Sequence, residues 1–317
     1  MDLSIIIVNW NSADYLRKCL RSIHETVKNL NYEVNVIDNA SYDGADAIIA
    51  QEFPSVRFIQ SSKNLGFARA NNEAFKASSG QSVVFLNPDT EVQGNAIESL
   101  HEQLRKLPQA GAVGPTLLNS DMTVQTSCIQ TFPTISNQAL DMEVLRGKFP
   151  RLKLWGMQAL YSNTDIPAVV EVISGACLMV RRDVFENVGM FSTDYFMYTE
   201  DIDLCYKIRT AGYKAYFVKD ARVIHHGGRS TKKADHNFVS DVEMRKSVYR
   251  YFQKTKGAKY ADIYKLSLKI AAVLRLIVLS FMSKNLGIKA GKTIEIRAST
   301  MKWMSIYEWT MGLNKFP

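Results

Sequence analysis

The sequence predicts an α/β protein with a mostly parallel central sheet, flanked by helices and followed by a basic helical region. Two observations support this: apolar β-branched runs alternate with amphipathic segments through the first hundred residues, and positive charge gathers after residue 230. The chain has 317 residues, 46% hydrophobic and 22% charged, which is enough apolar material for a large core. This composition excludes a disordered chain and a small disulfide scaffold.

Hydrophobic periodicity defines the first elements. Leu3–Val8 is an apolar run rich in β-branched residues, typical of a strand buried on both faces of a parallel sheet. Ser12 can cap a helix whose apolar stripe extends from Leu16 to Val27. The alternation continues, with strands expected at Val34–Ile37, Val56–Ile59 and Val83–Leu86 and helices near Asp46–Phe53, Ala68–Ala77 and Ala96–Leu107. Such alternation is typical of βαβ units.

Two of the expected strands end in polar segments. Asp38–Gly44 follows the second strand, and Asn87-Pro88-Asp89 follows the strand that ends at Leu86. Ligands of open α/β sheets bind beyond the carboxyl ends of the strands, so we expect the chemistry there. The sequence contains neither G-x-G-x-x-G nor G-x-x-x-x-G-K-[ST], which excludes a dinucleotide fingerprint and a P-loop.

The positive charge belongs to the C-terminal region. Residues 231–317 contain 17 Lys or Arg and 6 Asp or Glu, a net charge of +11, so the total of +8 leaves residues 1–230 at −3. No helix-turn-helix, zinc-finger or RNP motif accompanies this charge, and nucleic acid is therefore not an expected partner.

A helix is expected over Ile263–Met282, where apolar residues recur with helical periodicity between Lys265, Lys269 and Arg275. Its uninterrupted apolar stretches are shorter than the ~20 residues of a membrane span, so spanning is not expected. Two interpretations stay open. Residues 260–317 form a basic amphipathic surface for an anionic membrane, or they pack on the main domain or on a second subunit of a homo-oligomer.

The cysteines indicate a reducing compartment. Cys19, Cys128, Cys177 and Cys205 are widely spaced and lie mostly among apolar neighbours, as reduced core thiols do. No secretory signal can be read after Met1. We expect a cytoplasmic protein, peripheral on the inner face of the cell membrane if its C-terminal helix binds lipid.

Seven ordered segments together resemble the family 2 inverting glycosyltransferases of GT-A fold, and most closely the bacterial rhamnosyltransferases. They are SIIIVNWN (4–11), VIDNASYDG (36–44), NLGFARANNEAF (64–75), FLNPDT (85–90), SGACLMVRR (174–182), TEDIDLCYKIRTAGY (199–213) and IHHGGRS (224–230). The resemblance implies a nucleotide-sugar-binding catalytic domain over residues 1–230, outside which residues 231–317 lie. It implies transfer of a sugar from a dTDP- or UDP-sugar to a cell-surface polysaccharide or lipid-linked glycan. The likeness to rhamnosyltransferases implies that this sugar is L-rhamnose.

The resemblance assigns Asp38 to the nucleobase, where its carboxylate would accept a hydrogen bond from the ring N–H of thymine or uracil. The alternative is an Asp that caps the following turn through Asn39 and Ser41. Asp43 either holds the nucleoside or starts the turn at Gly44. The remaining residues assigned to nucleotide-sugar binding are Asn9, Asn11, Asn39, Asn64, Gly66, Asn71, Asn87, Asp89 and Gly175. A plain helix N-terminus would explain Asn64, Gly66 and Asn71 almost as well.

A divalent cation, Mg²⁺ or Mn²⁺, is the implied cofactor. Asn87-Pro88-Asp89 stands where the wider fold has Asp-x-Asp, so an amide replaces the first carboxylate. Asp89 can ligate a hard cation that bridges the two phosphates. The family's H-x-x-G-x-S spacing places a second ligand on His225. A β-turn and a packed histidine are the structural alternatives.

Basic residues follow the histidine. Arg229, Lys232 and Lys233 could offset charge on the departing diphosphate, or they could form a solvated loop.

The catalytic assignment falls on the start of the helix expected at Ile202–Arg209. Acidic residues are common in a first helical turn for electrostatic reasons alone. The resemblance nevertheless makes Asp201 the general base, which accepts a proton from the acceptor hydroxyl. Glu200 would orient the acceptor, and Asp203 would support the helix.

A rival interpretation keeps the fold without the reaction: a non-catalytic GT-A-like partner of a membrane glycan-assembly complex that binds nucleotide or glycan. The amide of Asn87 favours this interpretation. The presence of Asp38, Asp89, Asp201 and His225 disfavours it. Metal-dependent turnover distinguishes the two.

Overall fold

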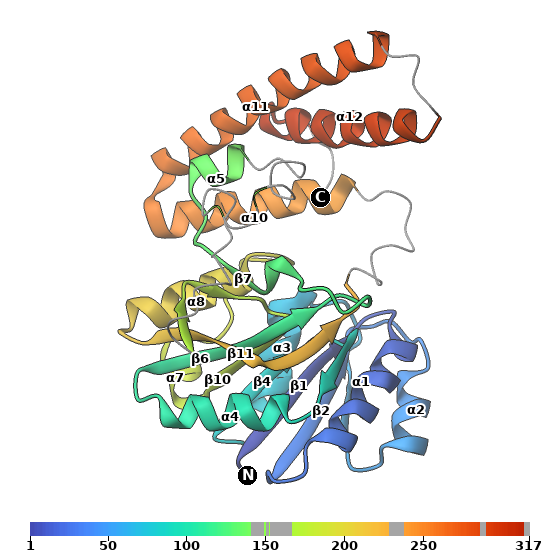
Figure 1. Ribbon diagram of the computed structural model, residues 1–317, viewed down its shortest axis with the longest axis vertical. Coiled ribbons are helices and arrows are strands. Elements are labelled where there is room, and N and C mark those ends of the chain that lie inside the picture. Colours follow the sequence, from blue (N-terminus) through green and yellow to red (C-terminus); the bar gives the residue numbers. More distant parts are fainter. Residues whose placement is uncertain (141–148, 150–151, 153–166, 228–237, 286–289, 314–317) are drawn as a thin grey trace. The chain divides into compact units, whose positions relative to one another are not determined.

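The computed structural model describes residues 1–140, 149, 152, 167–227, 238–285 and 290–313. The chain forms two compact units (Figure 1). The first comprises Met1–Phe132, Pro150–Lys153 and Met157–Ser230, and the second comprises Pro133–Phe149, Leu154–Gly156 and Thr231–Pro317. The helical unit thus includes a segment from the middle of the chain besides the residues after 230.

A nine-stranded sheet forms the centre of the first unit, in the order β3-β2-β1-β4-β10-β6-β11-β5, with β8 paired to β11. Strands β3, β2, β1, β4, β6 and β11 run in one direction, and β10, β5 and β8 run in the opposite direction. The bounds are β1 Leu3–Asn9, β2 Tyr32–Asp38, β3 Arg57–Gln60, β4 Ser82–Leu86, β5 Thr90–Gln93, β6 Ala110–Leu118, β8 Ala168–Val170, β10 Cys177–Arg181 and β11 Lys214–His225. A small separate sheet pairs β7 (Ile129–Gln130) with β9 (Val172–Ile173).

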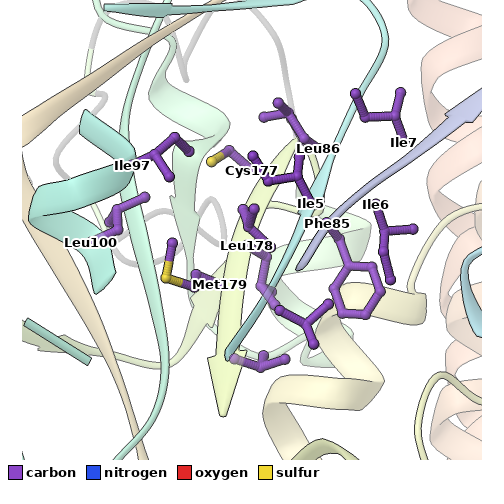
Figure 2. Packing of buried hydrophobic residues seen from close by; sticks show 14 of the residues in the cluster. Ile5, Ile6, Ile7, Phe85, Leu86, Ile97, Leu100, Cys177, Leu178 and Met179 are labelled. Atoms are coloured by element: carbon purple, nitrogen blue, oxygen red, sulfur yellow. The ribbon is translucent and has the colours of Figure 1, made fainter. Parts of the chain in front are cut away.

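The centre of the sheet is buried on both faces. All seven residues of β1 and all five of β4 are buried, as the apolar runs predict. Ile5 lies in register between Val34 of β2 and Val84 of β4. Figure 2 shows how side chains of β1, β4, β10 and the helix that follows β5 gather in this core.

Helices supply the rest of the core. They are α1 Ala13–Thr26, α2 Ala45–Glu52, α3 Gly66–Lys76, α4 Ala96–Lys106, α7 Arg182–Asn187 and α8 Glu200–Thr210, with a 3₁₀ turn at Thr126–Cys128. The expected apolar stripe of α1 is buried at Leu16, Leu20 and Ile23. All four cysteines, which lie among the described residues, are buried free thiols.

The predicted cap of α1 is wrong. Ser12 occupies the N-cap position, but its hydroxyl donates to the Trp10 carbonyl at 3.0 Å. The first turn is bonded instead by Asp43, whose Oδ2 accepts from the Ala13 backbone N–H at 2.9 Å. The loop after β2 brings this carboxylate to the helix, and a carboxylate is a stronger acceptor than a hydroxyl at the positive end of a helix.

The second unit is helical, with α5 Ile135–Ala139, α10 Phe238–Lys256, α11 Ala258–Asn285 and α12 Ala290–Thr310. Val242, Ala272, Trp303 and Ile306 form a small core. The Arg275 guanidinium lies over the Trp303 ring, 4.1 Å from its centroid. The helix predicted over Ile263–Met282 is confirmed within α11.

Helix α11 carries an exposed apolar face. Residues Ala258–Ser283 are long and apolar enough to cross a membrane, so the expectation that the segment is too interrupted to span does not hold by length and composition. The basic residues of α11 are far enough apart that long stretches of the helix remain apolar on average. Long basic side chains can also extend toward polar surroundings. The exposed apolar residues are Ile263, Leu266, Ile270, Val273, Leu274, Ile277, Val278, Phe281 and Met282.

A substitution at Gly80 tests the close packing beside β1. A Cβ added there would lie 2.4 Å from the Ser4 nitrogen and 2.5 Å from the Leu3 carbonyl carbon, both backbone atoms. We expect Gly80→Ala to lower the free energy of unfolding by about 1–3 kcal/mol through overpacking, measured by urea denaturation. The exposed neighbour Gln81→Ala should change it by less than about 0.5 kcal/mol. Equal stability of the two variants would contradict this packing.

Candidate functional site

The polar segments meet at one edge of the sheet. Strand β1 ends at Asn9, β2 at Asp38 and β11 at His225, and these strands run in the same direction. Strand β4 ends just before Asn87, and antiparallel β10 begins just after Gly175. The structure thus brings the predicted segments to the carboxyl edge, where open α/β sheets bind ligands.

Asp38 is the centre of a hydrogen-bond network and is only 1% exposed. Its Oδ1 accepts from Asn9 Nδ2 at 2.8 Å and from the Ser41 hydroxyl. Its Oδ2 accepts from the backbone N–H groups of Ser41 at 3.0 Å and Tyr42 at 3.2 Å, and from Gln60 Nε2 at 2.8 Å. The turn-capping arrangement is therefore present, and a nucleobase N–H would have to replace one of these donors.

The charge of Asp38 is stabilised in place. Burial alone would raise the pKa of this carboxyl, but hydrogen bonds from Ser41, Gln60 and Asn9 together hold it below its ordinary value. Gln60 is exposed, so its side chain is the donor that can be exchanged most easily. Sequence reasoning did not identify Gln60, because nothing distinguishes an exposed glutamine at a strand end until pairing places it beside β2.

Asn9 joins two carboxylates. Its Nδ2 donates to Asp38 and, at 3.0 Å, to Asp43 Oδ1, and the residue is fully buried. The buried Asn9 side chain therefore fixes the loop after β2 by hydrogen bonds to both carboxylates. Asn11 is exposed and left-handed at φ 52°, a conformation that asparagine tolerates.

A second asparagine pair shapes the loop before α3. Asn39 Nδ2 donates to Asn64 Oδ1 at 2.8 Å, and this oxygen also accepts from the Gly66 N–H at 2.9 Å. Gly66 has φ +74°, and a Cβ there would lie 2.4 Å from the Phe196 carbonyl oxygen, so only glycine fits. Asn71 is buried and donates to the Phe67 carbonyl within α3 at 3.0 Å, which is a structural contact.

Asp89 and His225 face each other. His225 Nε2 lies 3.3 Å from Asp89 Oδ1 and 3.4 Å from Asn87 Nδ2. The other ring nitrogen, Nδ1, lies 2.8 Å from Gln125 Oε1. The structure therefore brings together the two predicted metal ligands and the predicted amide.

These residues fit a divalent cation that is shared with a ligand. Neighbouring ligands of an octahedral ion with bonds of about 2.1 Å lie about 3 Å apart, close to the 3.3 Å between Asp89 Oδ1 and His225 Nε2. Among the described residues, no group of three or more His, Cys, Asp or Glu gathers to hold a metal. The remaining coordination positions would belong to phosphate oxygens or water.

His226 lies beside this pair. His226 Nε2 lies 2.8 Å from Glu91 Oε1, and its Nδ1 lies 2.8 Å from the Ser120 hydroxyl. Its backbone N–H donates to the Asp89 carbonyl at 2.9 Å, which aligns the two segments. Arg229, Lys232 and Lys233 lie outside the described residues.

The acidic pair opens α8. The two oxygens of Asp201 accept from the backbone N–H groups of Gly175 at 2.9 Å and Ile202 at 2.8 Å. Glu200 is 8% exposed, and its Oε2 is buried without a hydrogen-bond partner. Backbone donors thus favour the ionised form of Asp201, whereas the surroundings of Glu200 favour the neutral acid.

Burial raises the pKa of both carboxyls. Burial and the neighbouring Asp201 raise the pKa of Glu200 to about 8. Burial also raises the pKa of Asp201, and its two backbone hydrogen bonds oppose that rise. The two backbone donors favour the ionised form of Asp201, and the lack of a partner for Glu200 Oε2 favours the neutral form of Glu200. An ionised carboxylate can act as a general base.

The backbone before the pair is strained. Tyr198 and Thr199 have φ values of 69° and 73°, which are unfavourable for residues that carry a Cβ. Strain of this kind persists where the surrounding structure fixes a functional geometry.

Asp203 is buried, with 2% exposure, and accepts hydrogen bonds from the hydroxyls of Ser192 and of Tyr195, the latter at 3.1 Å. It therefore supports the helix as predicted.

Two neighbouring residues tie the acidic pair to the Asp89 loop. The Gly175 N–H donates to Asp201, and the Ala176 carbonyl accepts from the Asn87 N–H at 2.9 Å. Consecutive residues are about 3.8 Å apart along the chain, so Asp201 and the Asp89 loop belong to one site.

Comparison with family models gives two matches. The Glycosyl transferase family 2 model matches residues 4–189, and the Glycosyl transferase family group 2 model matches residues 143–288. The first match spans every predicted site segment up to Gly175.

Curated relatives and a solved structure agree. The N-acetylglucosaminyl-diphospho-decaprenol L-rhamnosyltransferase of Mycobacterium tuberculosis is 30% identical over 72% of this chain and 77% of its own. Rhamnosyltransferase WbbL of Escherichia coli K12 is 24% identical over 80% and 93%. The Pyrobaculum calidifontis mannosyltransferase PcManGT, solved with GDP-Man and Mn²⁺, has a TM-score of 0.60 and 16% identity over 98% of this chain and 86% of its own. This structural likeness supports the predicted GT-A architecture.

The raised pKa of Glu200 makes stability depend on pH. The buried neutral acid stabilises the fold fully below its unfolded pKa of about 4.5, and this contribution is lost as pH rises through about 8. Glu200→Gln, which is always neutral, should match the wild type near pH 4 and exceed its free energy of unfolding near pH 8 by at least about 1.4 kcal/mol, the equivalent of one pKa unit. Urea denaturation at both pH values measures this.

The exposed Glu25→Gln is the matched control and should show no such pH dependence. A constant difference between Glu200→Gln and wild type across this range would contradict the assignment of the proton to Glu200.

Proposed function

Because the chain belongs to glycosyl transferase family 2, we propose that this glycosyltransferase moves L-rhamnose from dTDP-rhamnose to a lipid-linked glycan or cell-surface polysaccharide, with inversion at the anomeric carbon. The observation that carries the proposal is the Glu200–Asp201 pair, tied through Gly175 and Ala176 to the Asp89–His225 pair. The choice of sugar is supported by two relatives whose names specify rhamnosyl transfer.

The nucleobase is bound at Asp38. The ring N–H of thymine donates to Asp38 Oδ2 in place of the exposed Gln60 side chain, so the number of hydrogen bonds to the carboxylate is conserved. Uracil presents the same N–H, and this contact alone therefore does not select between dTDP- and UDP-sugars. Asn11 and Asn64, which are both exposed, offer further hydrogen bonds to the nucleoside.

The diphosphate lies against Asp89 and His225. These two residues would hold a Mg²⁺ or Mn²⁺ ion, which supplies positive charge to the leaving diphosphate. Support comes from the donor set and from Mn²⁺ in the mannosyltransferase of similar fold. Asn87, being neutral, adds a hydrogen-bonding group rather than a second negative charge to the site.

Asp201 is the general base. The acceptor hydroxyl passes its proton to Asp201 while its oxygen bonds to the anomeric carbon and the bond from that carbon to the diphosphate oxygen breaks. Glu200, holding its own proton, keeps a second negative charge away from the base and can donate a hydrogen bond to the acceptor. The backbone N–H groups of Gly175 and Ile202 orient the carboxylate.

The helical unit binds the membrane surface on the side where a lipid-linked acceptor is presented. The exposed apolar side chains of α11 insert into the membrane surface. Lys265 and Lys269 are attracted to anionic lipid headgroups. The proposed location is the cytoplasm, peripheral on the inner face of the membrane.

Asp201→Asn tests the reaction. Loss of the base should lower kcat by about 10²–10⁴-fold, while the dissociation constant for dTDP-rhamnose changes less than about 3-fold, because the carboxylate contacts the acceptor side. Single-turnover transfer and calorimetry measure the two quantities. Asp220→Asn, an exposed carboxylate on β11, is the control and should retain full turnover.

Full turnover by Asp201→Asn would show that this residue is not the base. Absence of metal-dependent transfer by the wild type, with retained nucleotide binding, would favour the non-catalytic partner instead.

The membrane contact is tested on the face of α11. The combined variant Leu266→Gln, Leu274→Gln and Phe281→Gln replaces three side chains that are more than half exposed. Binding to vesicles that contain anionic lipid should fall at least about 10-fold because apolar area is lost from insertion, as measured by co-sedimentation. Unchanged binding, with helical content preserved by circular dichroism, would exclude this face as the membrane contact.

A further inference from the structure

A tight turn after β6 delivers a glutamine to the site. The Asn119 N–H donates to the Thr123 carbonyl at 2.8 Å, and the Met122 N–H donates to the Asn119 carbonyl at 2.9 Å. The Gln125 N–H then donates to the Leu117 carbonyl at 2.8 Å, which fixes the returning chain beside β6. Gln125 therefore reaches His225 from a hydrogen-bonded turn, although no sequence motif marks it.

A chain of hydrogen bonds fixes the direction of the Gln125 amide. The Asp121 carboxylate accepts from the Thr123 hydroxyl, so the hydroxyl oxygen is free to accept from Asn119 Nδ2 at 2.9 Å. Asn119 Oδ1 then accepts from Gln125 Nε2 at 3.2 Å. The amide oxygen of Gln125 is thereby directed at His225 Nδ1, 2.8 Å away.

We infer that Gln125 is a positioning residue that selects the tautomer of His225, keeping the proton on Nδ1 and a lone pair on Nε2. An amide oxygen can only accept, so Nδ1 must carry the hydrogen. Nε2 then presents its lone pair toward Asp89 Oδ1 at 3.3 Å. Two electron pairs that face each other at this distance attract a cation.

The consequence for metal binding rests on the proposed function. A histidine ligand must offer an unprotonated nitrogen, and a hydrogen bond at the other nitrogen holds the ring in the required orientation. Without Gln125, the Asp89 carboxylate, 3.3 Å from Nε2, would be the acceptor for the imidazole proton, and Nε2–H would donate to it. In that tautomer a proton is bound to Nε2, the atom that would otherwise bind the metal.

The tautomer can be measured in metal-free protein. Two-bond ¹H–¹⁵N correlation spectra at alkaline pH, where imidazoles are neutral, should show His225 with hydrogen on Nδ1 in the wild type. Gln125→Leu should shift His225 toward the Nε2–H form. Gln125→Glu, whose carboxylate can also only accept, should keep the Nδ1–H form. Gln130→Leu makes the same change on β7, and it should leave His225 as in the wild type.

An Nε2–H tautomer in the wild type, or an unchanged tautomer in folded Gln125→Leu, would overturn the inference. These results do not depend on any reaction, so they separate failure of the inference from failure of the proposed function.

Metal affinity gives the second readout. With dTDP present, Mn²⁺ titrations followed by electron paramagnetic resonance should show affinity about 10- to 100-fold weaker in Gln125→Leu, as expected for loss of a partner behind a ligand. Gln125→Glu and Gln130→Leu should bind Mn²⁺ within a few-fold of wild type. Wild-type affinity in Gln125→Leu would overturn the positioning role. Failure of wild type itself to bind Mn²⁺ would overturn the proposed metal site, and the tautomer spectra alone would then decide the role of Gln125.

Discussion

Parallel strands that end at one edge of a sheet are the constraint on which the rest of this structure depends. The buried runs of β1, β2 and β4 fix where Asn9, Asp38 and Asn87 lie. Antiparallel β10 then brings Gly175 back to the same edge, where its N–H holds Asp201. Each functional side chain is placed by an element whose own stability comes from apolar burial.

The surroundings of Glu200 and Asp201, rather than their residue types, make the two carboxyls differ in their tendency to ionise. Asp201 is bonded by two backbone N–H groups, whereas one oxygen of Glu200 is buried without a partner. A buried ionised carboxylate without such bonds is strongly unfavourable, so the surroundings favour the proton on Glu200. A single carboxylate is then available to accept a proton, which is what attack by an acceptor hydroxyl needs.

The sequence predicted strands β1 to β4, helices α1 to α4 and α8, and the edge where the site lies, because apolar periodicity records burial directly. It did not predict Gln60 or Gln125, which contact Asp38 and His225 only after strand pairing and a tight turn bring them there. The same limit explains Ser12: the capping carboxylate of Asp43 arrives from another part of the chain. For α11, periodicity predicted a helix correctly, but apolar residues that could have packed against protein are exposed.

The central claim is that this edge binds a nucleotide-activated sugar together with a divalent cation. Calorimetric titration of the protein with dTDP-rhamnose and with a UDP-hexose, each with and without Mn²⁺, tests it most directly. The account predicts binding of dTDP-rhamnose that Mn²⁺ strengthens, and loss of that strengthening in Asp89→Ala. Preference for the UDP-hexose would keep the site but change the sugar. Binding of neither compound, with or without Mn²⁺, would contradict the claim.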